Sequence, residues 1–320
     1  MTNSIADVAA LAGRVIAEVE RAVVGKRPIL EKIMAAILAD GHILLEDYPG
    51  LGKTLIARCF AVTLGLEFKR IQFTPDLLPA DITGSSVYDR ASGRLELRKG
   101  PVFANIILAD EINRASPKTQ SALLEAMQEH QVTLEGETMK LPEPFVVIAT
   151  QNPIEYEGTF PLPEAQLDRF IMKIAVGYPT PEEERQILMR RRERRRDEII
   201  LGQVTSAVDV LAIRQVVEGV YIDEDLERYI VALVGATRYD RRVSVGASPR
   251  GSLALLKLAR ARAAIDGRDY VLPDDIKTFI RPALAHRLIL VPDLWMKRHA
   301  ADEVINAIAQ SVPVPVVEGT

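Results

Sequence analysis

Cysteine is almost absent from this sequence, and histidine is scarce. The 320 residues include one cysteine, Cys59, so the chain cannot form a disulfide within itself. Cys59 lies in an apolar stretch between Leu55 and Phe60, where a buried, inert thiol is expected rather than a redox centre. The four histidines, at positions 42, 130, 286 and 299, are far apart. No structural metal site is therefore predicted.

Long apolar runs and an excess of basic charge are also missing. No uncharged apolar run approaches the roughly 20 residues that span a bilayer, and the first seven residues contain no basic segment followed by an apolar one. The protein is therefore expected to be cytoplasmic. Its net charge of −4 provides no overall basic field that would attract nucleic acid. With 48% hydrophobic and 26% charged residues, the 320 residues predict a globular protein of two domains, with three as the alternative.

Two sequence patterns divide the chain. Between about residues 41 and 176, short apolar runs with high β-propensity alternate with helical stretches. The candidate strands are residues 43–45, 68–73, 106–109, 145–149 and 170–176. The third and fourth are almost entirely apolar, as expected of strands covered by helices on both faces. Helical connections separate several of these runs, which predicts an α/β fold with a parallel sheet.

Two segments interrupt the alternation of strands and helices. Residues 87–97 predict two short strands around Ser92-Gly93. Residues 132–141 alternate apolar and polar side chains around Gly136. Both patterns predict β-hairpins that project from the core, at about residues 85–98 and 131–142.

Beyond residues 178–181 the pattern indicates helices alone. Residues 223–238 form one amphipathic segment, Ser248-Pro249 is a favourable helix start, and Pro273 begins a further helix. The change predicts a first domain over residues 1–179 and an all-α domain over residues 180–310. Residues 311–320 contain two prolines within a valine-rich run, and we expect a flexible tail there.

A glycine-rich loop follows the first predicted strand and precedes an apolar helix, in the sequence Asp-Tyr-Pro-Gly-Leu-Gly-Lys-Thr over residues 47–54. Strand, loop and helix in this order are typical of a phosphate-binding loop. The glycines let backbone amides face the phosphates, Lys53 supplies positive charge, and the Thr54 hydroxyl can ligate Mg²⁺. The predicted nucleotide-binding residues are Gly50, Leu51, Gly52, Lys53, Thr54 and Leu55.

The loop departs from the usual pattern at one position, because Asp47 replaces its first glycine. Aspartate tolerates left-handed backbone geometry better than most residues, so we expect the loop to keep its conformation. The alternative interpretation is a tight turn between strand and helix with an incidental Gly-Lys-Thr sequence.

The strand at residues 106–109 is followed by two acids, Asp110 and Glu111. The carboxyl ends of parallel strands form the edge at which open α/β sheets bind ligands. Asp110 can hold Mg²⁺ together with Thr54, and Glu111 can orient and activate an attacking water. Solvated acids at a strand exit are the alternative, but the phosphate-binding loop favours the catalytic interpretation.

The order of these motifs resembles the AAA+ superfamily and, within it, the MoxR-type ATPases. The resemblance covers about residues 24–290 and is carried by residues 45–54, 109–115, 149–153 and 157–170. The last stretch, Glu-Gly-Thr-Phe-Pro-Leu-Pro-Glu-Ala-Gln-Leu-Asp-Arg-Phe, is the most specific. The resemblance implies ATP as ligand, a five-stranded sheet, a helical lid and a hexameric ring whose pore the two hairpins face.

Three further residues match motifs of that family. Asn152 matches a polar sensor of the γ-phosphate, Arg169 matches an arginine finger that reaches the neighbouring subunit's ATP, and Arg250 matches the second sensor in the lid. Each has an alternative interpretation. Asn152 could start a turn, Arg169 could pair with Asp168 on the surface, and Arg250 could be solvated.

The arginines at positions 190–192 and 194–196 suggest contact with nucleic acid. Residues 182–184 are glutamates that begin the same predicted helix, and the helix dipole favours acids at its start and arginines at its end. No aromatic residues alternate with the arginines to stack on bases. A solvated or intersubunit face is therefore favoured over a nucleic-acid site.

These observations favour an ATP-driven, chaperone-like remodeller of a partner protein. In MoxR-type systems the usual partner carries a von Willebrand A domain. An ATPase subunit of a metal chelatase is a related alternative. A nucleic-acid motor is less favoured, because the chain has neither an appended DNA-binding domain nor a basic excess. A nucleotide-dependent scaffold without turnover is disfavoured by the presence of Glu111, Asn152 and Arg169.

Overall fold

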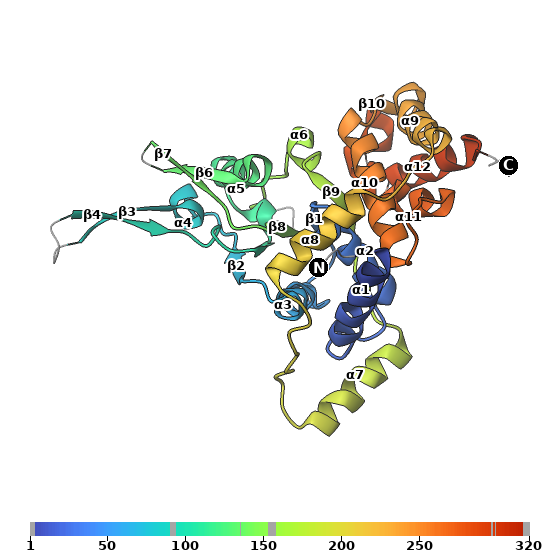
Figure 1. The fold of residues 1–320 in the computed structure, drawn as a ribbon. Helices are drawn as coiled ribbons and strands as arrows, with labels where there is room; N and C mark the ends of the chain where they lie inside the picture. The colour runs from blue at the N-terminus through green and yellow to red at the C-terminus, as the bar shows by residue number, and fades with distance from the viewer. Residues whose placement is uncertain are drawn as a thin grey trace.

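The computed structural model describes residues 4–89, 94–134, 136–152, 158–295, 297 and 299–315, and Figure 1 shows how they are arranged. In chain order the helices are α1 (Ile5–Glu20), α2 (Arg27–Leu38), α3 (Lys53–Leu64), α4 (Pro79–Thr83), α5 (Pro117–Glu129), α6 (Glu164–Leu167), α7 (Pro181–Arg194), α8 (Ala207–Glu218), α9 (Glu224–Tyr239), α10 (Pro249–Ile265), α11 (Pro273–Leu284) and α12 (Ala300–Ser311). Short 3-10 turns lie at Ile112–Arg114, Ala285–Arg287 and Pro292–Leu294.

A five-stranded parallel sheet has the strand order β2-β5-β8-β1-β9. Its strands are β1 (His42–Glu46), β2 (Phe68–Gln72), β5 (Ile106–Asp110), β8 (Val146–Gln151) and β9 (Phe170–Ile174). The predicted parallel sheet is therefore confirmed, with strands at all five predicted positions. Ile106 and Leu108 of β5 pack in one hydrophobic cluster with α1, α2 and α3, whereas Ile107 and Ala109 pack in another with α5. Successive side chains of a strand point to opposite faces, so β5 is buried on both sides.

Two antiparallel hairpins extend away from the sheet (Figure 1). The first pairs β3 (Gly84–Asp89) with β4 (Arg94–Lys99), and the second pairs β6 (Gln131–Leu134) with β7 (Glu137–Lys140). Both predicted hairpins are present. The predicted turn at Ser92-Gly93 lies outside the described residues.

The region after β9 is mainly helical, as predicted. Thr180 and Ser248 cap the starts of helices α7 and α10, and the side chain of each accepts a backbone N–H of the first turn. The region also contains a short antiparallel pair, β10 (Val243–Val245) and β11 (Ile289–Leu290), which the sequence did not indicate. Strands of three and two residues are too short to show an alternating pattern. Residues 316–320 of the predicted tail lie outside the described part.

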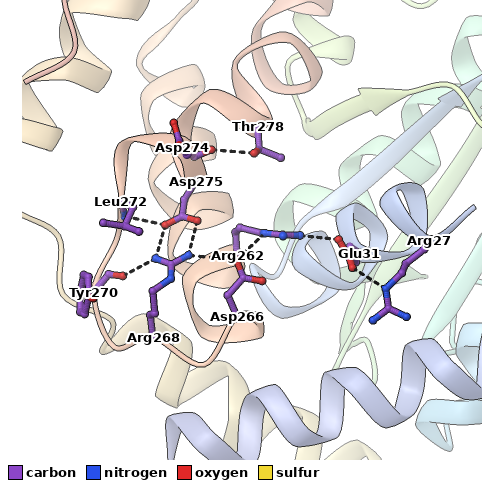
Figure 2. A network of polar contacts seen from close by, with 10 residues as sticks. All are labelled: Arg27, Glu31, Arg262, Asp266, Arg268, Tyr270, Leu272, Asp274, Asp275 and Thr278. Atoms are coloured by element: carbon purple, nitrogen blue, oxygen red, sulfur yellow. Dashed lines mark hydrogen bonds and ion pairs between the residues drawn. The ribbon is translucent and has the colours of Figure 1, made fainter.

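The helical region packs against the N-terminal helices. Helices α1 and α2 share one hydrophobic cluster with α8 to α12 and with one face of the sheet. A polar network reinforces this contact (Figure 2), in which Arg262 of α10 pairs with Glu31 of α2 at 2.7 Å and with Asp266 at 3.1 Å. The core thus continues across the predicted domain boundary near Thr180, and the division into domains stays a prediction. No helix among the described residues is both long and apolar enough to cross a membrane.

Candidate functional site

The parallel register brings most of the predicted site residues to one edge of the sheet. Glu46, the last residue of β1, pairs with Gln151 of β8, and Asp110, the last residue of β5, pairs with Gln72 of β2. The loop at residues 47–54 leaves β1 at this carboxyl edge, where ligands of open α/β sheets bind. Asp110, Glu111, Asn152 and the loop therefore share the carboxyl edge.

The loop has the backbone that its glycines allow. Gly50 and Gly52 have φ angles of +82° and +79°, in the left-handed region that favours glycine. Helix α3 begins at Lys53, so its unpaired N-terminal amides face the loop. The Lys53 Nζ donates to the carbonyl oxygen of Asp47 at 2.6 Å. Burial lowers the pKa of Lys53, and three nearby carboxylates oppose this shift, those of Asp47, Asp110 and Glu111.

Asp47 does not use the left-handed backbone that was expected to explain its presence. It is absent from the non-glycine residues with positive φ, so the reason offered for aspartate is wrong, while Gly50 and Gly52 have the left-handed backbone expected of the loop. Its side chain is engaged instead: Oδ1 accepts the N–H of Tyr48 at 2.8 Å, and Oδ2 accepts the N–H of Gly177 at 2.6 Å. Asp47 is only 6% exposed. A hydrogen-bonded carboxylate, rather than a tolerant backbone, accounts for aspartate at this position.

Asp110 is 9% exposed and is bound by two neighbouring strands. Its Oδ2 accepts from Nη2 and Nε of Arg70 on β2, at 2.7 and 3.0 Å. Its Oδ1 accepts from the Thr150 hydroxyl on β8 at 2.6 Å. Arg70 and Thr150 were not predicted as site residues. They contact Asp110 because β2 and β8 flank β5 in the sheet.

Glu111 follows the strand in a left-handed conformation, with φ at +56°. Its backbone N–H donates to the Thr150 hydroxyl at 2.8 Å. Its Oε2 accepts from Gln72 Nε2 at 2.9 Å and from Arg114 Nη1 at 3.0 Å. Gln72 and Arg114 thus hold the carboxylate that was predicted to activate water. The signal for Arg114 was its position three residues after Glu111, whereas Gln72 gave no local signal.

The donor set at this edge fits Mg²⁺ bound jointly with a nucleotide. Thr54 is half-buried and Asp110 is buried, so the edge offers one hydroxyl and one carboxylate close to the loop. Across the described residues, no group of three or more His, Cys, Asp or Glu side chains could hold a metal by itself. Mg²⁺ is commonly bound by one or two protein oxygens together with substrate phosphates, which is the arrangement available here.

Asn152 comes directly after β8 and is 7% exposed. The preceding Gln151 accepts the N–H of Asp47 through its carbonyl oxygen at 3.2 Å, so this strand end adjoins the loop. Residues 153–157 lie outside the described part of the chain.

A cavity of about 550 Å³ adjoins the helix that follows the loop. It lies between the end of α1, the outer side of α3 and helix α7. Apolar side chains line one part of it, including Val24, Leu55 and Ile187. Arginines line another part, at positions 21, 58, 190, 191 and 194. Leu55, the last residue of the predicted nucleotide-binding segment, lines this cavity and directly follows Thr54 in the chain.

Arg169 lies at the opposite edge of the sheet. It precedes Phe170, which pairs with His42 at the beginning of β1, whereas the loop follows the end of β1. Five strand residues separate these edges, or roughly 15 Å at about 3.3 Å per residue. Its Nε donates to Gln128 Oε1 of α5 at 3.0 Å, beside a cavity of about 260 Å³. The structure therefore does not bring Arg169 to the loop of its own subunit.

Arg250 lies beside Asp168, the residue that precedes Arg169 in the chain. Its Nε lies 4.0 Å from Asp168 Oδ2. Asp168 also accepts from Arg287 Nε at 2.8 Å and from the Ser248 hydroxyl at 3.0 Å. The surface ion pair between Asp168 and Arg169, considered as an alternative, is not among the ion pairs of the described residues. Asp168 instead ties the start of β9 to the helical region.

Comparison with known proteins gives consistent matches over the whole chain. Residues 42–172 match the ATPase family associated with various cellular activities (AAA), and residues 235–308 match the AAA lid domain. The chain is 49% identical over 310 residues to Uncharacterized protein YeaC of Bacillus subtilis, with 97% of each chain covered. It is 45% identical over 320 residues to Chaperone MoxR1 of Mycobacterium tuberculosis, with 95% of this chain and 82% of the relative covered.

A solved structure extends the comparison to the fold. The crystal structure of a protein from Cytophaga hutchinsonii superposes with a TM-score of 0.91 at 44% sequence identity. The match covers 98% of this chain and 97% of the other. The sheet, the hairpins and the helical region therefore have the arrangement of a known protein.

Proposed function

The chain belongs to the MoxR-type AAA+ ATPases, and from that premise we propose that it binds Mg-ATP and hydrolyses it as a hexameric ring. The observation that carries this proposal is the convergence of four features at the carboxyl edge of the sheet. They are the loop at residues 47–54, Asp110, Glu111 and Asn152. The matched family supports nucleotide binding, and the geometry supports hydrolysis at this edge.

The chemistry follows from the groups at the edge. Backbone amides around Gly50 and Gly52, together with Lys53, would bind the phosphates. Thr54 and Asp110 would hold Mg²⁺, which when bound neutralises charge on the phosphates. Glu111 would accept the proton of the attacking water. To do so, its carboxylate exchanges its bonds with neighbouring side chains for a bond to water.

The base and ribose would occupy the 550 Å³ cavity beside α3. Its volume lies within the range of about 300–1,000 Å³ that is typical of small-molecule sites. Val24, Leu55 and Ile187 provide apolar surface for a base. Leu55, which lines the cavity, directly follows Thr54, and this adjacency supports a nucleotide that would extend from the loop into the cavity.

We propose that both Arg169 and Arg250 act on the nucleotide of a neighbouring subunit. Arg169 lies at the sheet edge opposite the loop, and Arg250 is held beside the same edge through Asp168. A guanidinium keeps its charge and can bind two phosphate oxygens, so either residue suits a γ-phosphate presented by another subunit. Because both arginines lie at the sheet edge opposite the loop of their own subunit, their position supports assembly into a ring.

The proposed work of the ring is chaperone-like remodelling of a partner protein, with a von Willebrand A-domain protein as the expected partner. The two hairpins that project from the sheet would contact the client. The name of the relative Chaperone MoxR1 supports the chaperone-like part of this proposal.

Mixing two inactive variants tests the ring. Glu111→Gln subunits keep the finger, whereas Arg169→Ala subunits keep the water-activating acid. In mixed rings some interfaces combine an intact finger with an intact acid, so partial ATPase activity returns. Arginine fingers contribute about 10³–10⁵ in rate in related enzymes, which makes the recovery measurable. A mixture that co-assembles and stays inactive would show that Arg169 does not act in trans.

A further inference from the structure

Asp47 connects the phosphate-binding loop to a segment 130 residues later in the sequence. Its Oδ2 accepts the N–H of Gly177 at 2.6 Å, while its Oδ1 accepts the N–H of Tyr48 at 2.8 Å. Gly177 has a φ of +71° and lies in the connection between β9 and α7. A glycine at position 47, as in the usual loop pattern, would have no side chain to form this connection.

The contacts continue from Gly177 towards the cavity beside α3. The rings of Tyr48 and Tyr178 lie 5.8 Å apart, and Lys26 Nζ donates to the Tyr178 carbonyl oxygen at 2.9 Å. A Cβ atom added at Gly25 would overlap the carboxylate of Glu183, so the first turn of α7 packs closely on this stretch. The next residue back, Val24, lines the cavity.

Beyond the contacts near its start, helix α7 is held to the rest of the chain by Arg190, which donates to the carbonyl oxygen of Glu20 at 2.6 Å. None of its side chains is buried, and it stands apart from the remaining helices in Figure 1. Nevertheless, Ile187 and three arginines of α7 form one wall of the cavity. The position of this wall therefore depends on the bonds near the start of α7 and on the bond of Arg190, and the bond from Asp47 to Gly177 is as short as that of Arg190.

We propose that Asp47 is a positioning residue that ties the phosphate loop to α7 and so holds the wall of the base cavity in place for binding. The inference rests on the proposed function, because it places a nucleotide across both the loop and the cavity. It predicts that Asp47 matters for ligands with a base and not for ligands made of phosphates alone. A carboxylate that accepts two backbone N–H groups suits this role, since charge-assisted bonds are stronger than neutral ones.

The test compares Mg-ADP with tripolyphosphate as ligands of three variants, by calorimetry. Asp47→Gly restores the usual glycine, and we expect its affinity for ADP to fall about tenfold, as for loss of one charge-assisted bond. Its affinity for tripolyphosphate should stay within about twofold of the wild type. Asp47→Asn retains one acceptor oxygen, so its ADP affinity should be intermediate.

Glu46→Gln is the matched control. Glu46 precedes Asp47 and also joins β1 to β9, through Lys173 at 2.8 Å, but it does not contact the segment before α7. Both ligands should bind it as they bind the wild type. Hydrogen exchange gives a second measurement: amides of residues 177–186 should exchange faster in Asp47→Gly and not in Glu46→Gln.

The outcomes separate the possibilities. If Asp47→Gly binds ADP as tightly as the wild type, the inference is wrong. If it loses both ligands equally, Asp47 serves the phosphate loop alone, and the link to the base cavity is wrong. A wild-type chain that binds neither ligand would instead overturn the proposed nucleotide site, together with this inference.

Discussion

At the scale of single residues, Asp110 and Glu111 have different environments, which suit the different roles that we propose for them. Asp110 is buried among strands, where Arg70 and Thr150 fix both of its oxygens. Glu111 is more open and has its backbone turned by a left-handed φ of +56°. A fixed, buried carboxylate suits metal ligation, whereas a turned and accessible one suits proton transfer.

Glu111→Gln should therefore separate binding from hydrolysis. The amide is isosteric but cannot accept the proton of water, so turnover should fall by about 10²–10⁴. ATP affinity should be unchanged, because Glu111 does not lie in the loop. Lys53→Ala, in contrast, should weaken binding itself. Steady-state ATPase assays and nucleotide titrations check both expectations. Equal turnover by Glu111→Gln and the wild type would show that Glu111 does not activate water.

The residues predicted from sequence share a local signal. Lys53 lies in a glycine-rich loop, and Asp110 and Glu111 end an apolar run. Arg70 and Gln72 have no such signal, since they contact the site only because β2 lies beside β5. Sheet order depends on packing across the whole domain, and one sequence read alone does not contain it.

At the scale of elements, helix α5 extends from near Glu111, the proposed water-activating acid, to Arg169, the proposed arginine finger. It starts at Pro117, six residues after Glu111, and it carries Gln128 to the side of Arg169. Arg169 uses its Nε for this bond, and within the described residues its terminal nitrogens have no recorded hydrogen bond. The bond therefore orients the guanidinium and leaves its terminal nitrogens for the phosphate that we propose Arg169 binds.

Gln128→Leu should reduce turnover about tenfold while leaving ATP affinity unchanged. A misplaced Arg169 guanidinium lowers the rate of hydrolysis without weakening the binding of ATP. Gln128→Glu keeps an acceptor oxygen and should recover most of the activity. Glu125→Gln, in the same small cavity, is the control and should resemble the wild type. The measurements are kcat and KM on assembled protein. Wild-type kcat in Gln128→Leu would exclude the positioning role.

The arginine-rich helix α7 shows why a charge run is a weak guide to function. Arg190 donates to the carbonyl oxygen of Glu20 at 2.6 Å, and Arg191 pairs with Asp197. Arg190 thus fastens α7 to the end of α1, and both arginines line the cavity beside α3. The preference for a solvated or intersubunit face over a nucleic-acid site stays a prediction, and the place of these arginines in a cavity wall could not be predicted from the sequence.

At the scale of the whole molecule, the hydrophobic core is less divided than the sequence pattern suggests. The change from strands to helices near Thr180 was clear in the sequence. However, α1 and α2 at the start of the chain pack with α10 near its end, and Arg262 pairs with Glu31 across this contact (Figure 2). Contacts between residues more than 200 positions apart leave no local pattern, so packing between the regions could not be predicted.

His42 joins three parts of this core and should make the fold sensitive to acid. Its Nε2 bonds the Met127 carbonyl oxygen of α5, and its Nδ1 accepts the N–H of Val147 on β8, each at 3.0 Å. These bonds require the neutral imidazole. Burial is the main cause that lowers the pKa of His42 from 6.5 to about 4.

The direction of the pH effect follows from these values. Between about pH 6.5 and pH 4 the unfolded chain binds a proton at His42 and the folded chain does not, so acid favours unfolding. Lowering the pH from 7.5 to 5 should cost about 2 kcal/mol of unfolding free energy through this group alone. In His42→Gln, which cannot titrate, the loss should be smaller by that amount.

Phe145→Leu removes a ring that packs on His42 at 5.8 Å and should lower stability equally at both pH values. Urea unfolding of the wild type and the two variants at pH 7.5 and 5 measures these differences in the free energy of unfolding. An unchanged pH dependence in His42→Gln would mean that the acid sensitivity arises elsewhere in the core.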